Sequence, residues 1–198
     1  MRATVDTLHS QPQTIRRLPA SGNAALAASA LIQAALGIEF LLSGLNKFAD
    51  PNFLADFGGF VRSSPATSRG VLSPLIQSLV LPNLALFGSL IKFTELILGI
   101  VLLVGAAEIA RRRFQGHFAR QYGYEAPVAL IAALAGLGAA GLSFSIFLLN
   151  GGVFPTIQPG RAFTSAIPVE LLIVPLGLAV AWLETGRFLV LSRSTRSR

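Results

Sequence analysis

The fold of this chain follows from residues 84–107, which read LALFGSLIKFTELILGIVLLVGAA and contain two charged side chains, Lys92 and Glu95. A helix needs about 20 predominantly apolar residues to cross ~30 Å of hydrocarbon, and this stretch is long enough. Three further stretches are comparably apolar: residues 24–46, 126–149 and 167–183. The sequence therefore predicts an all-α membrane protein, a bundle of four transmembrane helices.

Composition agrees with a membrane protein that has one domain. Hydrophobic residues make up 53% of the 198 residues and charged residues 13%, whereas soluble domains average about 25% charged residues. We expect one transmembrane domain at residues 24–190, a polar tail at residues 1–23 and a basic tail at residues 191–198. This division leaves no room for a separate soluble domain.

The net charge of +7 is distributed as membrane topology would distribute it. Most arginines lie in the two tails and in the connection that contains residues 111–113. We therefore expect an integral protein of a bacterial cytoplasmic membrane with both termini in the cytoplasm. The expected partner of the arginines is the lipid bilayer with its anionic head groups, and no nucleic acid is expected.

Residues 52–83 separate the first two apolar stretches and are more than a linker. They contain Phe53, Phe57 and Phe60 among glycine, serine and proline residues. We predict short amphipathic helices at residues 52–62 and 74–81, because one mobile loop would leave these rings in water. The connection is thus expected to form a partly helical cap on the outer face.

The third apolar stretch has small residues at a spacing of four, Ala132, Gly136 and Ala140. A small-residue face lets helices approach closely in lipid. The face is expected to contact either a neighbouring helix of the chain or a partner protein subunit, and the sequence does not choose between them.

Charged residues inside the spans mark the place to look for function, because a charge in hydrocarbon needs a partner, a cavity or a ligand. Glu39 lies about 13 Å from the outer end of its helix and Lys92 about 12 Å from the outer end of the next one, at 1.5 Å per residue. We therefore predict a buried ion pair between Glu39 and Lys92, with Glu95 nearby.

Helical spacing places Glu39, Ser43, Asn46 and Lys47 on one polar stripe, and Glu170 begins the fourth span at the same outer end. These groups are expected to line a pocket or proton-linked site in the outer half, suited to a polar-headed lipophile such as a quinone. Two alternatives remain. The charges only hold helices together, or they form part of an ion path, although no matching polar chain was identified in the inner half.

Intrinsic metal cofactors are not expected. The chain has no cysteine, and its two histidines, His9 and His117, lie outside the spans. The spans therefore lack the ligands for an iron–sulfur cluster, for a zinc site or for a haem with two histidine ligands.

Two motifs carry a resemblance to a known family. Residues 37–53 read GIEFLLSGLNKFADPNF, and residues 95–105 read ELILGIVLLVG after Leu81-Pro82. Over residues 30–107 the chain resembles the DoxX-like membrane proteins, which are four-helix bundles and include the DoxD-type membrane subunit of thiosulfate:quinone oxidoreductase and MauE-like proteins. The match singles out Gly44, Lys47 and Glu95, whereas Glu39 and Lys92 have no place in the family pattern.

The resemblance implies a membrane subunit of a quinone-associated redox complex. Glu39 or Glu95 would supply protons, and Lys47 or Lys92 would stabilise the anion that develops on the quinone. The alternatives are a non-catalytic scaffold that assembles a larger complex and a transporter of a small solute, and whether the chain is itself an enzyme stays open. The candidate catalytic residues are Glu95 and Lys47, and the candidate quinone-binding residues are Glu39, Lys92, Ser43, Asn46 and Glu170.

Overall fold

The structure, a computed structural model, describes residues 20–69, 71–114, 123–152 and 167–196. Four long helices dominate these segments: α1 (Ala20–Ala49), α5 (Leu84–Phe114), α6 (Glu125–Leu149) and α7 (Val169–Arg196). All four are long and apolar enough to cross a membrane, and no strand occurs in the described segments. The predicted four-helix membrane fold is confirmed, and the chain is an integral membrane protein.

Both terminal helices extend into the predicted tails. α1 begins at Ala20, inside the tail expected at residues 1–23, and residues 1–19 lie outside the described segments. α7 continues to Arg196, through most of the tail expected at residues 191–198. The first helix ends at Ala49, before Asp50 and Pro51, because proline disfavours helix in the residue before it and cannot continue helical hydrogen bonding.

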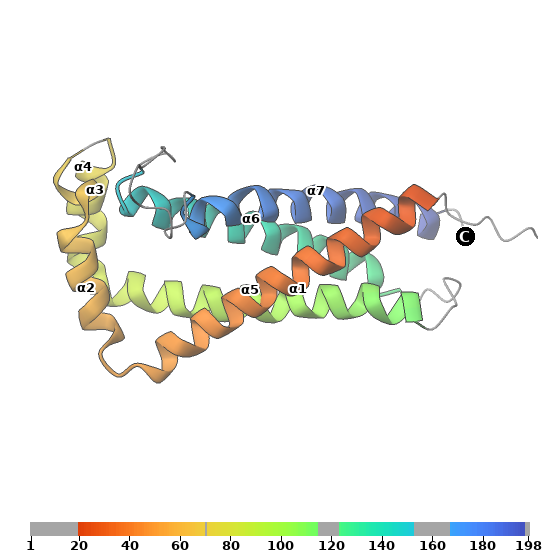
Figure 1. Ribbon diagram of the computed structural model, residues 1–198, viewed down its shortest axis with the longest axis horizontal. Helices are drawn as coiled ribbons and strands as arrows, with labels where there is room; N and C mark the ends of the chain where they lie inside the picture. The colour runs from red at the N-terminus through yellow and green to blue at the C-terminus, as the bar shows by residue number, and fades with distance from the viewer. Residues whose placement is uncertain (1–19, 70, 115–122, 153–166, 197–198) are drawn as a thin grey trace, which may run out of the picture.

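The helices run antiparallel in chain order (Figure 1). One end of the bundle holds the start of α1 and α6 and the end of α5 and α7, and we call it the terminal end. The other end is covered by the 53–83 segment, and we call it the cap end. α1 crosses the bundle obliquely, from α7 at the terminal end to α5 at the cap end.

The cap is built from short helices across the bundle. It comprises α2 (Phe53–Ser63), α3 (Pro65–Ser68), α4 (Ser73–Leu75), a π-helical turn η1 (Ile76–Val80) and a 3₁₀ turn η2 (Leu81–Asn83). Phe57 and Val61 of α2 are buried against Ala66 and Ile76, and the Ser64 hydroxyl donates to the Leu149 carbonyl. Both helical segments predicted in this connection are confirmed.

Glycines set the register between α1 and α5. A Cβ atom at Gly99 would lie 2.5 Å from the backbone nitrogen of Leu41, and one at Gly44 would lie 2.8 Å from that of Leu96. The two backbones can approach this closely only because glycine has no side chain. Small residues are common at contacts between helices in lipid for this reason. Gly44 is thus level with Leu96, and Leu41 with Gly99.

The small-residue face of α6 packs on α7 of the same chain. A Cβ atom at Gly136 would lie 2.7 Å from the carbonyl oxygen of Gly177, and one at Gly177 would lie 2.6 Å from that of Gly136. Ala132 and Ala140 on the same face are buried. The sequence allowed this face to contact either another helix of the chain or a partner subunit. In the structure it contacts α7 of the same chain, and α7 covers it from any partner subunit.

We expect Gly99→Leu to destabilise the protein by about 3 kcal/mol, since the added side chain meets the rigid backbone of Leu41 rather than a movable group. The matched control is Gly141→Leu, because a Cβ atom at Gly141 meets nothing within 4 Å and Gly141 is exposed. Thermal unfolding in detergent measures both. Equal midpoints for the two variants would contradict the close α1–α5 contact.

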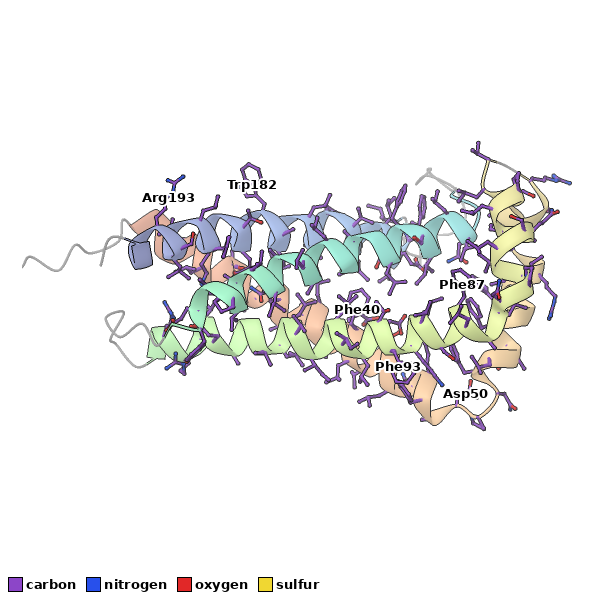
Figure 2. The ribbon with its side chains drawn as sticks, turned by 180° about the vertical axis from the view of Figure 1, so that it is seen from behind. Phe40, Asp50, Phe87, Phe93, Trp182 and Arg193 are labelled. Carbon is purple, nitrogen blue, oxygen red and sulfur yellow. The ribbon has the colours of Figure 1, made fainter. Side chains whose placement is uncertain are left out.

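An apolar layer fills the middle of the bundle. Phe40 of α1 points into the space between the helices (Figure 2) and is 4% exposed. The buried members of this layer are Leu36, Phe40, Leu98, Leu102, Ala135, Ala139 and Val180. The layer separates the polar groups near the cap end from those near the terminal end.

Candidate functional site

The polar centre near the cap end is an ion pair between α1 and α5. The Lys47 Nζ atom lies 2.6 Å from Oε2 of Glu95 and 2.8 Å from Oγ of Ser43. The Glu95 side chain is 3% exposed and that of Lys47 is 24% exposed. A carboxylate buried this deeply in a membrane-spanning segment needs such a partner.

Local sequence explains why these three residues meet. Ser43 and Lys47 are four residues apart, so they share one face of α1. Gly44 lies one turn before Lys47 and packs on the backbone of Leu96, the residue that follows Glu95. The close helix contact at Gly44 therefore brings the lysine within reach of the glutamate. The three residues that the family resemblance singled out, Gly44, Lys47 and Glu95, form one structural unit.

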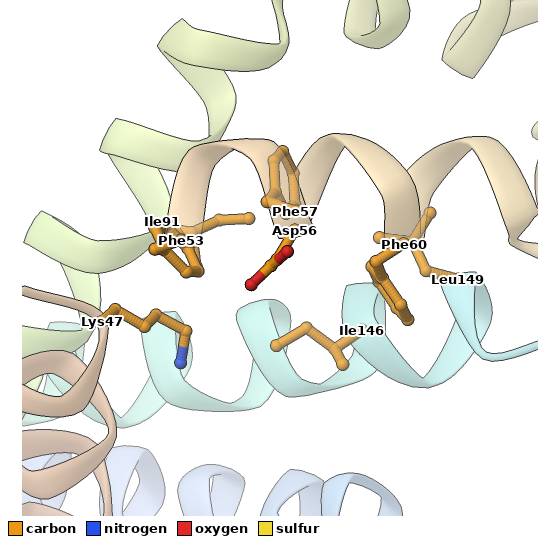
Figure 3. A pocket seen from close by; sticks show the side chains of 8 residues that line it. All are labelled: Lys47, Phe53, Asp56, Phe57, Phe60, Ile91, Ile146 and Leu149. Atoms are coloured by element: carbon orange, nitrogen blue, oxygen red, sulfur yellow. The ribbon is translucent and has the colours of Figure 1, made fainter. Parts of the chain in front are cut away.

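A cavity of about 310 Å³ adjoins this ion pair (Figure 3). Its walls come from α1, α2, α5 and α6 and are mostly apolar. The residues around it are Lys47, Phe53, Asp56, Phe57, Phe60, Ile91, Ile146 and Leu149. The Lys47 ammonium and the Asp56 carboxylate are the two charged groups at this apolar space.

The Lys47 ammonium retains a donor for a ligand. An ammonium group has three N–H donors, and Ser43 and Glu95 occupy two of them. No further hydrogen bond from Nζ to a described residue is present, and the centroid of the Phe53 ring lies 6.0 Å away. A polar atom in the cavity can therefore accept the third hydrogen bond.

The predicted Glu39–Lys92 ion pair is wrong. The Lys92 Nζ atom lies over aromatic rings, 4.8 Å from the Phe48 centroid and 5.9 Å from that of Phe93, and it has no ion pair among the described residues. Glu39 and Phe48 are nine residues apart on α1, which is two and a half turns, so they lie on opposite sides of the helix.

The depths of the two residues also differ, because the helix register is not the one assumed from the sequence. With Gly37 against Leu103 and Leu41 against Gly99, Glu39 is level with Val101, nine residues or about 13 Å from Lys92. The depth estimate placed the outer boundary at Leu84. That first turn of α5 packs beneath the cap instead, beyond the end of α1.

The polar stripe of α1 is divided between two environments. Ser43 and Lys47 face the bundle, whereas Glu39 and Asn46 are exposed on the outer surface of α1. Glu39 and Asn46, both predicted to bind a quinone, therefore do not reach the cavity.

Glu170 lies at the cap end but away from the cavity. Its carboxylate accepts a hydrogen bond of 3.3 Å from the Asn150 side chain, so the ends of α6 and α7 meet as expected. It is not part of the cavity wall. The ion pair of Lys47 is with Glu95 and not with Glu170.

A second polar centre at the terminal end was not predicted. Glu184 of α7 accepts hydrogen bonds from Ser29 (2.6 Å) and Gln33 (3.0 Å) of α1. Arg187 binds Glu184 at 3.0 Å and also forms an ion pair with Glu108 of α5. Through this centre α1, α5 and α7 are joined by buried polar contacts.

Helix α6 joins the same centre through Glu125. Arg112 of α5 lies 2.5 Å from Glu108 and 2.9 Å from Glu125. All three carboxylates are buried, with Glu184 at 0%, Glu125 at 2% and Glu108 at 6% exposure. Arg112 was expected at lipid head groups and is instead bound inside the protein. The available signal was the helical spacing of Glu108 with Arg112 and of Glu184 with Arg187.

The terminal-end half of the bundle therefore contains buried polar residues, which the sequence argument against an ion path did not include. The apolar layer around Phe40 and Leu102 nevertheless separates the two centres, so no polar chain joins them within the described segments.

Comparison of the chain with models of protein families, with curated proteins and with solved structures finds no match. The resemblance to the DoxX-like proteins therefore stays a prediction from the two motifs, and the chemistry of the site is argued from its geometry.

Proposed function

We propose that this chain is the membrane subunit of a quinone-associated redox complex, and that the cavity beside Lys47 binds the quinone head group. The observation that carries the proposal is the unused N–H donor of Lys47 at a largely apolar cavity. Ligand sites of this kind combine apolar walls with a few polar groups that fix orientation.

The side chains present fit a quinone. Phe53, Phe57 and Phe60 offer apolar faces for a ring, and Lys47 offers a hydrogen bond to one carbonyl oxygen. A cavity of about 310 Å³ is at the lower end of the range for small-molecule sites, which suits a head group whose isoprenoid tail remains in the bilayer.

The ion pair gives the site its chemistry. A bound quinone takes up two electrons and two protons when it is reduced to the quinol, and in this proposal the electrons come from a partner subunit that carries a redox cofactor. Lys47 orients the ring and holds positive charge next to its oxygen atom. The Lys47 ammonium can donate a proton to the reduced ring. Glu95, 2.6 Å away, can then pass to that nitrogen a proton that it has first taken up from water, so that both protons of the quinol come from water.

The alternatives have less support. A scaffold that binds a partner through Ala132, Gly136 and Ala140 would need a face that α7 already covers. A transporter would need a path through the layer around Phe40. The test of the proposal is equilibrium binding of a quinone to the purified protein and its Lys47 variants, as set out in the Discussion.

We further propose that the terminal end faces the cytoplasm of a bacterial cell, because the two tails and the arginine-rich connection lead from that end. The chain has no cysteine, so a single introduced thiol is its only reactive thiol. Ser63→Cys in the cap should react with a membrane-impermeant maleimide on intact spheroplasts, and Arg193→Cys only after permeabilisation. Both positions are exposed. Labelling in the reverse order would refute this orientation.

A further inference from the structure

The exposed face of α1 carries a seven-residue repeat. Two rows of residues are exposed at this spacing, Ala28, Ala35 and Leu42 in the first, and Leu31, Ile38 and Leu45 in the second. Glu39 and Asn46, also seven residues apart and also exposed, lie beside the first row, four residues after Ala35 and Leu42 respectively. Neither polar side chain has a hydrogen bond or ion pair to any described residue.

Glu39 lies deep in the membrane. It is ten residues before the end of α1 at Ala49, or about 15 Å along the helix, and the hydrocarbon is ~30 Å thick. A carboxyl group at this depth that faces lipid is costly unless another polar group binds it.

No basic group of the described chain can serve as that partner. Lys92 is about 13 Å nearer the cap end and lies on the opposite side of α1, beside Phe48. Lys47 is bound to Glu95, and Arg187 is bound to Glu108 and Glu184 at the terminal end. Within the described segments Glu39 therefore has no partner, and a polar group on another molecule can supply one.

We propose that this molecule is a second copy of the chain, and that two copies associate in the bilayer through the exposed face of α1. Two copies with the same orientation in a membrane are related by a two-fold axis along its normal. Each residue and its counterpart then lie at the same depth, and residues beside the axis face their counterparts. With the axis along the row of Ala28, Ala35 and Leu42, Glu39 lies beside Glu39 of the second copy, and Asn46 beside Asn46.

Both residue types can bind to themselves. A carboxyl that holds its proton donates one hydrogen bond and accepts another, and an amide does the same. Polar side chains of this kind join helices in lipid, and the small Ala28 and Ala35 allow close approach. A repeat of seven residues is also the spacing that keeps one seam of two helices in contact.

Disulfide cross-linking in native membranes tests the interface, because the chain has no cysteine of its own. Leu42→Cys should give a cross-linked dimer on oxidation. The matched control is Leu134→Cys on α6, since Leu42 is 54% exposed and Leu134 is 58% exposed. We expect at least a fivefold higher dimer yield for Leu42→Cys. Equal yields would mean random collision and would overturn the proposal, as would a cross-link from Leu42→Cys to a protein of different mass.

A second substitution tests the role of the carboxyl group. In the Leu42→Cys background, Glu39→Leu should lower the dimer yield several-fold, whereas Glu39→Gln should retain it because an amide also pairs with itself. Glu39 faces outward, so Glu39→Leu is expected to fold, and its elution volume and unfolding midpoint in detergent check this. An unchanged dimer yield in the folded Glu39→Leu protein would overturn the pairing.

Discussion

Quinone binding should weaken at least about tenfold when the Lys47–Glu95 pair is replaced by two apolar side chains. The double variant Lys47→Met/Glu95→Met removes the hydrogen bond to the ligand without leaving Glu95 as an unpaired buried charge, which would destabilise the fold on its own. A tenfold change corresponds to about 1.4 kcal/mol, a reasonable value for one hydrogen bond from a charged donor. Equilibrium binding of a short-chain quinone to the purified protein measures it.

The control for this experiment is Lys92→Met. Lys92 is also a half-buried lysine near the cap end, but it lies over Phe48 and Phe93 and is not part of the cavity wall. Its removal should leave the dissociation constant unchanged. If the double variant binds quinone as tightly as the native protein does, the ion pair only holds α1 against α5 and the proposed site is wrong.

Glu95→Gln separates binding from proton supply. The amide keeps the shape of the side chain and can still accept a hydrogen bond from Lys47, but it cannot exchange a proton. Binding should survive while quinone-dependent turnover of the complex is lost. Normal turnover with this substitution would end the redox mechanism even if quinone binding persisted.

The helices and the cap follow from local sequence. The lengths of the apolar stretches and the position of Asp50-Pro51 are enough to place the spans and the end of α1. The cap helices follow from phenylalanine and proline positions in residues 52–83. Each of these predictions needs only neighbouring residues, and each is confirmed.

The contacts between helices were predicted less well from the sequence, because they depend on how far one helix is shifted along its neighbour. Close contacts at Gly37, Gly44 and Gly99 set the register of α1 against α5. The depth estimate from the sequence took Leu84 as the outer end of the second span, and the register it implied differs from the observed one by about nine residues. A shift of that size moves Lys92 from the level of Glu39 to that of Phe48. The family motif was the better guide, since it singled out Lys47 and Glu95 without an estimate of depth.

Periodicity also grouped residues that the structure separates. Glu39 and Lys47 are eight residues apart, which turns the helix by about 80° beyond two full turns. An arc of this width reaches from the lipid-facing surface to the bundle interior. The four polar residues therefore do share one side of α1, but Glu39 at one edge of this side faces outward and Lys47 at the other edge faces the bundle.

The terminal-end centre was missed for a further reason. Each helix contributes only one or two of its residues. Glu108, Glu125 and Glu184 directly flank the predicted apolar stretches, where a charged residue is ordinarily assigned to the membrane interface. Only the antiparallel assembly of four helices brings Gln33, Glu108, Glu125 and Glu184 together.

Arg187→Met should destabilise the protein by about 3 to 5 kcal/mol, the largest stability effect expected for any single substitution considered. Arg187 is 7% exposed and binds both Glu184 and Glu108, so its removal leaves two buried carboxylates short of a cation. Loss of one partner in a buried ion pair typically costs this much, since the remaining charge stays desolvated. Unfolding in detergent, followed by circular dichroism, measures the loss.

Arg193→Met is the matched control, because Arg193 lies six residues further along α7, is exposed and points away from the bundle (Figure 2). It should change stability by less than about 0.5 kcal/mol. Adding Glu108→Gln and Glu184→Gln to Arg187→Met should recover part of the loss, because amides carry no charge that needs a cation. If Arg187→Met unfolds at the same temperature as Arg193→Met, the terminal-end centre does not hold the four helices together, and its carboxylates must be stabilised by other groups.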